Sequence, residues 1–205
     1  ANNDLTVTGV AGNGDISLQS TSGQITHSNG TSVDVTTASG ALTLDAITGI
    51  ALDTQVASLD VDNSTSGDVV MTEVDALSVM KLVQGGSGAV SLSVLNNTLT
   101  VSGAGSGIST GSGELILATL ENEVLSSVQG SGVLTLLPAT NSQAITLGGA
   151  ADSGVALDLT ASDLANLADG FSLIQVGYAG GSHVLTVSAT TLTDAVTFRA
   201  SAGSI

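Results

Sequence analysis

Positive charge, aromatic rings and cysteine are almost absent from this chain. Only Lys81 and Arg199 are basic among 205 residues, against 18 acidic ones, so the formal net charge is -16. Phosphate binding needs clustered lysine and arginine, so nucleic acid is excluded as a partner and an anionic membrane surface is disfavoured. Because there is no cysteine, disulfides, thiolate metal ligands and cysteine nucleophiles are excluded as well.

Long hydrophobic runs are also missing. No stretch approaches the roughly 18 apolar residues of a membrane-spanning helix, so we expect no membrane insertion. The chain is nevertheless 42% hydrophobic with a mean hydropathy of +0.46, whereas disordered chains combine low hydrophobicity with high charge. It is therefore expected to fold around a large buried core. Its first residues do not resemble a signal peptide, and we expect it to be a segment of a longer protein.

Short triplets of the form apolar, polar, apolar recur along almost the whole chain, bordered by Gly, Ser, Asn, Asp or Thr. Alternation at period 2 places the apolar pair on one face and the polar residue on the other. Each triplet therefore predicts a short strand with one buried side. The triplets are Ile16–Leu18, Val33–Val35, Leu42–Leu44, Ile50–Leu52, Leu59–Val61, Val69–Met71, Leu77–Val79, Val90–Leu92, Leu99–Val101, Leu115–Leu117, Leu134–Leu136, Ile145–Leu147, Leu157–Leu159, Leu185–Val187 and Val196–Phe198.

The regular spacing of these triplets indicates a repeat architecture. A β-sandwich is the competing all-β fold, but its core usually needs bulky aromatics, and only Phe171, Tyr178 and Phe198 are present here. A parallel β-solenoid has a narrow interior that stacked Leu, Ile, Val and Ala can fill. Three strands would close a coil of roughly 20 to 27 residues, giving about eight to ten coils. We therefore predict an all-β parallel β-helix, or β-solenoid, with one or two short helical decorations.

Two places depart from the strand rhythm. Between residues 103 and 130 we expect an irregularity, because 103–113 is rich in Gly and Ser and a short helix competes with a strand over 118–129. A second helix is predicted over 162–169, capped by Ser162 and ended by Gly170. We interpret residues 1–205 as a single solenoid segment, and two sub-domains meeting near residue 105 are the less favoured alternative.

Four segments carry a family resemblance: residues 14–26 (GDISLQSTSGQIT), 39–46 (SGALTLDA), 48–53 (TGIALD) and 156–171 (ALDLTASDLANLADGF). They resemble the repeats of filamentous-haemagglutinin-like exoproteins and other giant bacterial surface proteins. The resemblance lies in composition and strand rhythm. It implies a right-handed β-helix that is secreted, displayed at the cell surface, and used in adhesion and biofilm formation.

Chemistry-bearing residues are few. His27 and His183 have no second nitrogen or thiolate ligand at short spacing, so both are interpreted as surface histidines, and no catalytic residue is assigned. The densest oxygen cluster is 60–68, in which Asp60, Asp62 and Asp68 are candidate ligands for a cation such as Ca²⁺. The commoner expectation for such carboxylates is a solvated outer face or turn. No organic cofactor is expected.

The sequence therefore predicts a structural, non-enzymatic, extracellular rod segment of a cell-surface adhesin or filament-forming protein. Its expected partners are neighbouring solenoid segments or identical subunits, end to end, and a host, cell-surface or matrix target. One alternative is a β-helix that binds or cleaves polysaccharide, with Asp60 and Asp62 as its carboxylates. Another is an ice-binding solenoid, since 6–8 and 98–100 are Thr-x-Thr pairs, although other turns interrupt any continuous threonine ladder.

Overall fold

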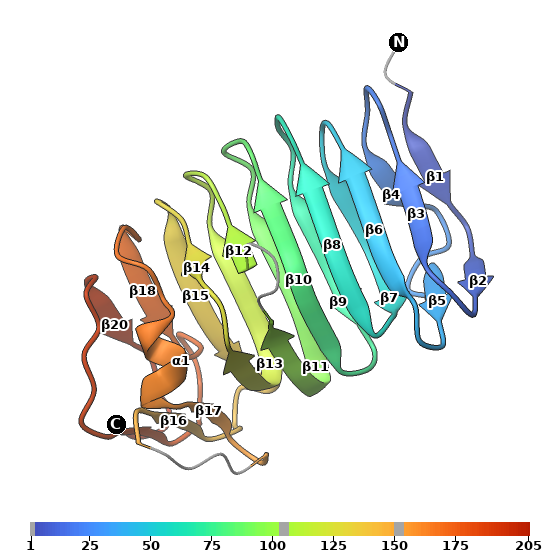
Figure 1. The fold of residues 1–205 in the computed structure, drawn as a ribbon. Coiled ribbons are helices and arrows are strands. Elements are labelled where there is room, and N and C mark those ends of the chain that lie inside the picture. Colours follow the sequence, from blue (N-terminus) through green and yellow to red (C-terminus); the bar gives the residue numbers. More distant parts are fainter. Residues whose placement is uncertain (1–2, 103–106, 150–153) are drawn as a thin grey trace.

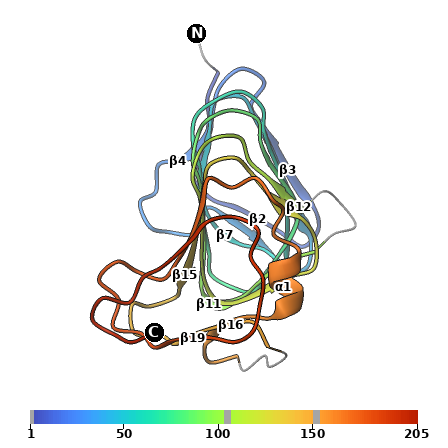
Figure 2. The same ribbon diagram turned by 90° about the vertical axis from the view of Figure 1, so that its left-hand side faces the viewer.

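The computed structural model describes residues 3–102, 107–149 and 154–205 and shows an all-β parallel β-solenoid of about nine turns with a single short helix. Successive turns lie side by side from the N-terminal to the C-terminal end (Figure 1). Viewed along the axis, the turns superpose as nested outlines (Figure 2). The predicted β-solenoid is confirmed, while the right-handedness implied by the family resemblance stays a prediction.

One sheet of 17 strands wraps around the axis, and a second sheet of three strands lies near the C-terminal end. The large sheet contains β1 (Leu5–Val7), β2 (Val10–Gly12), β3 (Ile16–Gln19), β4 (Ile25–His27), β5 (Val35–Thr37), β6 (Ala41–Ala46), β7 (Ile50–Gln55), β8 (Ser58–Asn63), β9 (Val69–Glu73), β10 (Leu77–Gln84), β11 (Val90–Val101), β12 (Gly107–Ser109), β13 (Leu115–Val124), β14 (Val128–Gln129), β15 (Val133–Pro138), β18 (Leu173–Val176) and β20 (Val196–Phe198). The small sheet contains β16 (Ile145–Leu147), β17 (Leu157–Leu159) and β19 (Leu185–Val187).

The register of the ladder gives the length of each turn. On one face, each member of a series of equivalent residues pairs with the next: Leu5, Ile25, Ile50, Val69, Val90, Leu115, Leu134, Ile174 and Val196. Successive turns therefore contain 20, 25, 19, 21, 25, 19, 40 and 22 residues. All but one lie close to the predicted coil length, and the long turn holds β16, β17 and the helix.

Aliphatic side chains of this series form a continuous column inside the solenoid. The seven inner members are at most 1% exposed: Ile25, Ile50, Val69, Val90, Leu115, Leu134 and Ile174. Burying one such side chain stabilises the fold by about 1.5–3 kcal/mol. Further columns, such as Leu42 above Leu59 and Leu44 above Val61, complete the core. The apolar pairs of most sequence triplets therefore face inward, as their period of 2 predicts, and Val187, at 44% exposure, is an exception.

The predicted helix is present, but its limits were wrong. Helix α1 covers Ala161–Ala165, and its N-cap is Thr160 instead of Ser162. Asp163 completes a capping box, since Thr160 donates its backbone N–H and its hydroxyl to the Asp163 carboxylate at 2.8 and 2.6 Å. The helix is short because the following residues rejoin the solenoid, where Leu167 forms a β-bridge with Val128.

The segment 118–129, over which helix and strand competed, forms the end of β13 and the whole of β14, with residues 125–127 between them. β13 continues to Val124 because its second half pairs with the end of β11, from Thr98 opposite Glu121 to Val101 opposite Val124. β14 then pairs with β12, so the ladder continues over 107–109 and 128–129. Residues 103–106 of the Gly/Ser-rich stretch lie outside the described residues. Inter-turn hydrogen bonding thus outweighs the helical spacing of the apolar residues.

Glycines stack at the corner that precedes one strand in several successive turns. A Cβ atom on Gly88 would clash with the carbonyl oxygen of Gly67 in the preceding turn, and one on Gly113 would clash with that of Gly88. Gly132 stands in the same relation to Gly113. The backbones of neighbouring turns approach so closely here that no side chain fits, which explains why glycine recurs just before the strands.

Candidate functional site

The carboxylates of Asp60 and Asp62 lie on the outer face of β8, where their side chains are 43% and 42% exposed. Lys81, on the adjacent strand β10, places its Nζ 3.8 Å from Asp60 Oδ1 and 3.1 Å from Asp62 Oδ2. The hydrogen bond to Asp62 is the largest influence and raises the pKa of Lys81. Burial acts in the opposite direction, and the charges of Asp62, Asp60 and Asp45 add to the upward shift. One of the two basic residues of the chain thus offsets part of the negative charge of Asp60 and Asp62, two of the three predicted cation ligands.

Asp68, the third predicted ligand, does not form an ion pair with Lys81 but contacts the backbone of the next turn. It is exposed, immediately precedes β9, and its Oδ1 accepts a hydrogen bond from the backbone N–H of Ala89 at 2.8 Å. The side chain therefore links one turn to the next at a corner. Cation binding by Asp60, Asp62 and Asp68 stays a prediction.

A different cluster forms where the ladder is interrupted. β4 and β5 both pair with β7, with Ile25 opposite Ile50 and Val35 opposite Thr54. The chain uses ten steps from Ile25 to Val35 where β7 uses four, so six residues, 28–33, leave the ladder. They project from the rod as the blue loop beside the β4 label (Figure 2). The two residues that flank this loop, His27 and Asp34, are thereby brought together over β7.

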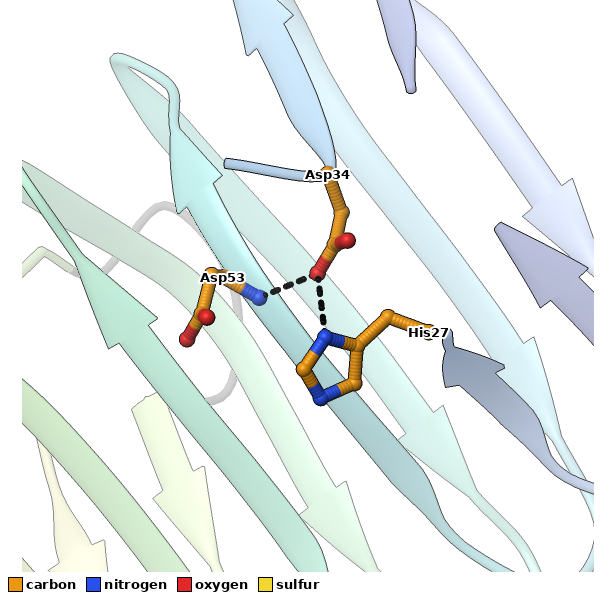
Figure 3. A group of neighbouring side chains, drawn as sticks. All are labelled: His27, Asp34 and Asp53. Carbon is orange, nitrogen blue, oxygen red and sulfur yellow. Dashed lines mark hydrogen bonds and ion pairs between the residues drawn. The ribbon is translucent and has the colours of Figure 1, made fainter. Parts of the chain in front are cut away.

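At the base of this loop the side chains of His27 and Asp34 point toward each other, and the backbone nitrogen of Asp53 faces the Asp34 carboxylate (Figure 3). His27 Nδ1 lies 3.4 Å from Asp34 Oδ2, and the same oxygen accepts the backbone N–H of Asp53 at 2.7 Å. Each residue offers one ligand atom, and these atoms lie within 4.8 Å of one another. Among residues 3–102, 107–149 and 154–205, this is the only group of three or more His, Cys, Asp or Glu side chains found with metal-binding geometry.

Asp34 is the most unusual member of the cluster. Its side chain is fully buried, whereas that of His27 is 27% exposed. Its second carboxylate oxygen, Oδ1, is buried and has no hydrogen-bond partner among the described residues. His27 Nδ1 has another neighbour, Asn29 Oδ1 at 3.2 Å, which comes from the loop itself. A histidine, two carboxylates and an amide oxygen therefore surround one small volume.

Sequence reasoning missed this cluster. The Val33–Val35 triplet predicted an outward-facing Asp34, but the strand begins only at Val35 and Asp34 is 1% exposed. His27 was interpreted as an isolated surface residue because its partners lie seven and 26 positions away in the sequence. The available signal was the polar run SNGTSV between a histidine and an aspartate, in a turn about five residues longer than its neighbours.

The other histidine was also misplaced by the sequence analysis. His183 was predicted to lie on the surface, but it is 0% exposed. Its Nε2 lies 2.7 Å from the carbonyl oxygen of Arg199 and its Nδ1 lies 3.2 Å from that of Asn141. The ring thus bridges two distant segments of the C-terminal turns. This position gives His183 a structural role.

A groove of about 730 Å³ runs beside β2 and β5, lined by Ala11, Gly12, Asn13, Thr36, Thr37, Ala38, Gln55 and Asp75. Asp75 is the one carboxylate in this lining, and it accepts a hydrogen bond from the Gln55 side chain at 2.9 Å. Glycoside hydrolysis by the usual mechanism needs two carboxylates across the substrate. This groove therefore does not supply the carboxylate pair that the polysaccharide-cleaving alternative requires.

No family model, no curated protein and no solved structure matches this chain. The class of protein that the fold defines is thus a β-solenoid of about nine turns, without assignment to a family. Within the described residues, no helix has the length and hydrophobicity needed to cross a bilayer.

Proposed function

We propose that this chain is a rigid rod segment of a large extracellular bacterial surface or filament-forming protein that acts in adhesion, biofilm or fibre assembly. The observation that carries the proposal is the ladder of nine equivalent positions from Leu5 to Val196, each paired with the next. At the strand spacing of about 4.8 Å, this ladder makes a rod roughly 40 Å long. Each turn contacts mainly its neighbours, so the architecture extends by adding turns.

The outer surface supports the same function. Like residues stack above one another in a solenoid, and small uncharged side chains tolerate this better than charged ones. The chain keeps charged residues to 10% of its length, while the net charge of -16 favours solubility until other segments or cations make contact. The cell-surface and adhesive role rests on the resemblance of the repeats to filamentous-haemagglutinin-like exoproteins.

The two ends of the ladder supply the proposed contact surface. Within the described residues, β1 pairs only with β4 and β20 pairs only with β18, so each has one edge without a partner strand. Val196 and Phe198 of β20 are only partly buried and pack against the core. An unpaired edge beside apolar side chains is suited to another parallel turn. The partner we propose is therefore a neighbouring solenoid segment or a second copy, end to end.

Electron microscopy and sedimentation velocity of the chain, each over a range of concentrations, test this proposal. We expect rods that lengthen with concentration and a repeat near 4.8 Å along their axis. Val196→Lys puts a charge on the partly buried side of β20 and should abolish the lengthening. Thr197→Lys adds the same charge on the exposed side of the same strand and is the matched control.

Rods that do not lengthen, or that lengthen equally in both variants, would argue against end-to-end stacking. Labelling of intact and permeabilised cells with an antibody tests the location, and labelling only after permeabilisation would contradict a surface role. Cleavage of a glycan by the wild-type chain, lost in Asp60→Asn or Asp62→Asn, would favour the enzymatic alternative instead.

A further inference from the structure

We propose that His27, Asp34 and Asp53 bind one divalent transition-metal ion of the Zn²⁺ type at the base of the 28–33 loop. This site is independent of the rod function. It is built by three chain segments: the end of β4, the residue before β5, and the middle of β7 (Figure 3). Each contributes one side chain with a metal-ligating atom.

The distances suit a small ion. Zn²⁺ binds nitrogen and oxygen ligands at about 2.0–2.2 Å in a tetrahedron, so two of its ligand atoms are about 3.4 Å apart. His27 Nδ1 and Asp34 Oδ2 are separated by 3.4 Å, and the Asp53 ligand atom lies within 4.8 Å of both. Rotation of the Asp53 side chain to another staggered rotamer would bring its carboxylate closer to the other two ligands. Asn29 Oδ1, 3.2 Å from His27 Nδ1, is placed for the fourth position.

The buried carboxylate of Asp34 supplies the electrostatic reason for a cation. A carboxylate removed from water needs hydrogen bonds or a compensating charge. Asp34 Oδ2 has both a backbone N–H and the imidazole nearby, but the equally buried Oδ1 has no partner among the described residues. No lysine or arginine is found to compensate the charge of Asp34 within the described residues. Lys81 forms its ion pairs with Asp60 and Asp62, and the ion-pair partner found for Asp34 is His27. A dication at the cluster would compensate this charge.

The ligand types favour a transition metal over Ca²⁺. Calcium takes six to eight oxygen ligands, whereas imidazole nitrogen suits Zn²⁺ and its neighbours. The backbone N–H of Asp53 that binds Asp34 Oδ2 would orient the carboxylate, as outer hydrogen bonds commonly do around metal ligands. The ion would join both ends of the 28–33 loop to the next turn, so it would act as a clip between turns.

Isothermal titration with ZnCl₂ in a non-chelating buffer tests the site. We expect one Zn²⁺ per wild-type chain, and at least tenfold weaker binding for His27→Gln and Asp34→Asn. Asp169→Asn, which removes an exposed carboxylate outside the cluster, is the matched control for attraction to the acidic surface and should bind like the wild type. An equal concentration of CaCl₂ should not compete.

Two further measurements separate binding from folding defects. In proton–nitrogen spectra of the two histidine rings, Zn²⁺ should shift the His27 signals and leave those of buried His183 unchanged. Asp53→Asn leaves the buried carboxylate in place and should also weaken binding. Absence of stoichiometric Zn²⁺ binding by the wild type would overturn the proposal, as would equal binding by His27→Gln and Asp169→Asn. In either case the His27 and Asp34 side chains form an ion pair only.

Discussion

The side-chain amide of Asn63 donates a hydrogen bond to Oε1 of Gln84 at 2.8 Å, directly across one step of the solenoid. Both side chains are buried, at 0% and 2% exposure. Asn63 Oδ1 accepts the N–H of Gly49 at 3.0 Å, and Gln84 Nε2 donates to the carbonyl of Gly67 at 2.6 Å. The pair therefore ties three successive turns together at one corner, with the polar groups of both amides used.

Asn63→Ala should destabilise the fold by about 2–4 kcal/mol, because it leaves the Gly49 N–H and the Gln84 oxygen buried without partners. Urea denaturation followed by circular dichroism measures the change. Asn96→Ala, the same substitution at an exposed position of β11, should change stability by less than about 0.5 kcal/mol. Equal losses of stability in the two variants would show that the buried hydrogen bonds of Asn63 do not stabilise the fold.

The close backbone approach at the stacked glycines predicts that substitutions at two glycines will differ in their effect on stability. Gly113→Ala should cost about 1–3 kcal/mol or more, because its Cβ would clash with the carbonyl oxygen of Gly88 in the preceding turn. Gly14→Ala has open space around the added Cβ and should be neutral or slightly stabilising. The thermal midpoints of the two variants test this, and a stable Gly113→Ala would refute the close approach of the turns.

Glu73 should give the stability a specific dependence on pH. Burial raises the pKa of Glu73 above its ordinary value of 4.5, and this outweighs the hydrogen bonds donated by Asp75, Thr54, Val56 and Val74, which lower it. Between 4.5 and the raised pKa, the folded chain keeps a proton that the unfolded chain has released. The free energy of unfolding should therefore fall as the pH rises through this window.

Denaturation curves at several pH values from 4 to 8 measure this slope. Glu73→Gln removes the titrating group, so the corresponding part of the slope should disappear. Glu123→Gln, at an exposed position, should keep the wild-type slope and corrects for repulsion among the many surface acids. The prediction is wrong if Glu73→Gln and the wild type have the same pH dependence.

Lys81 should stabilise the fold by reducing the repulsion between the carboxylates around it. Asp45 stacks directly on Asp62, so Lys81→Gln exposes like charges to each other and should cost up to about 1 kcal/mol at low ionic strength. The loss should shrink in 1 M salt, where charges are screened over about 3 Å. Arg199→Gln removes the same charge at a position where no ion pair is found within the described residues, and should have a smaller effect.

The same variant tests the predicted Ca²⁺ site. If Asp60 and Asp62 bind Ca²⁺, then Lys81→Gln should increase the rise in melting temperature on adding CaCl₂, because the competing ammonium group is gone. Combining Lys81→Gln with Asp62→Asn should remove this gain. An unchanged response to CaCl₂ in Lys81→Gln would count against cation binding at these residues.

The local alternation of apolar and polar residues predicted most strands, because each strand can be recognised from its own residues alone. Leu42–Leu44, Leu59–Val61 and Leu134–Leu136 each alternate at period 2, and each lies within a strand whose apolar residues face the core. Helix α1 was located for a similar reason, since Asp163 marks its first turn. The early end of the helix could not be predicted, because it depends on Val128, a residue in the preceding turn with which the chain pairs again at Leu167.

Residues whose environment depends on register could not be placed from the sequence. The His27 and Asp34 side chains meet only because six residues leave the ladder between them, and Asp53 joins them only through pairing with β7. The burial of Asn63 and Gln84 has the same origin, because their separation of 21 positions becomes a direct contact once the turns are stacked.

The sequence by itself determined the architecture: apolar alternation at period 2, spaced by glycine and small polar residues, leaves a narrow aliphatic core and short parallel strands as the consistent solution. Only the tertiary structure decided which polar residues meet. Stacking brings together residues that lie about 20 positions apart, and the inserted residues 28–33 bring His27 and Asp34 together over β7. The register of the turns is set by all the inter-strand hydrogen bonds together. It therefore decides where Asp34, His27 and Asp53 come together.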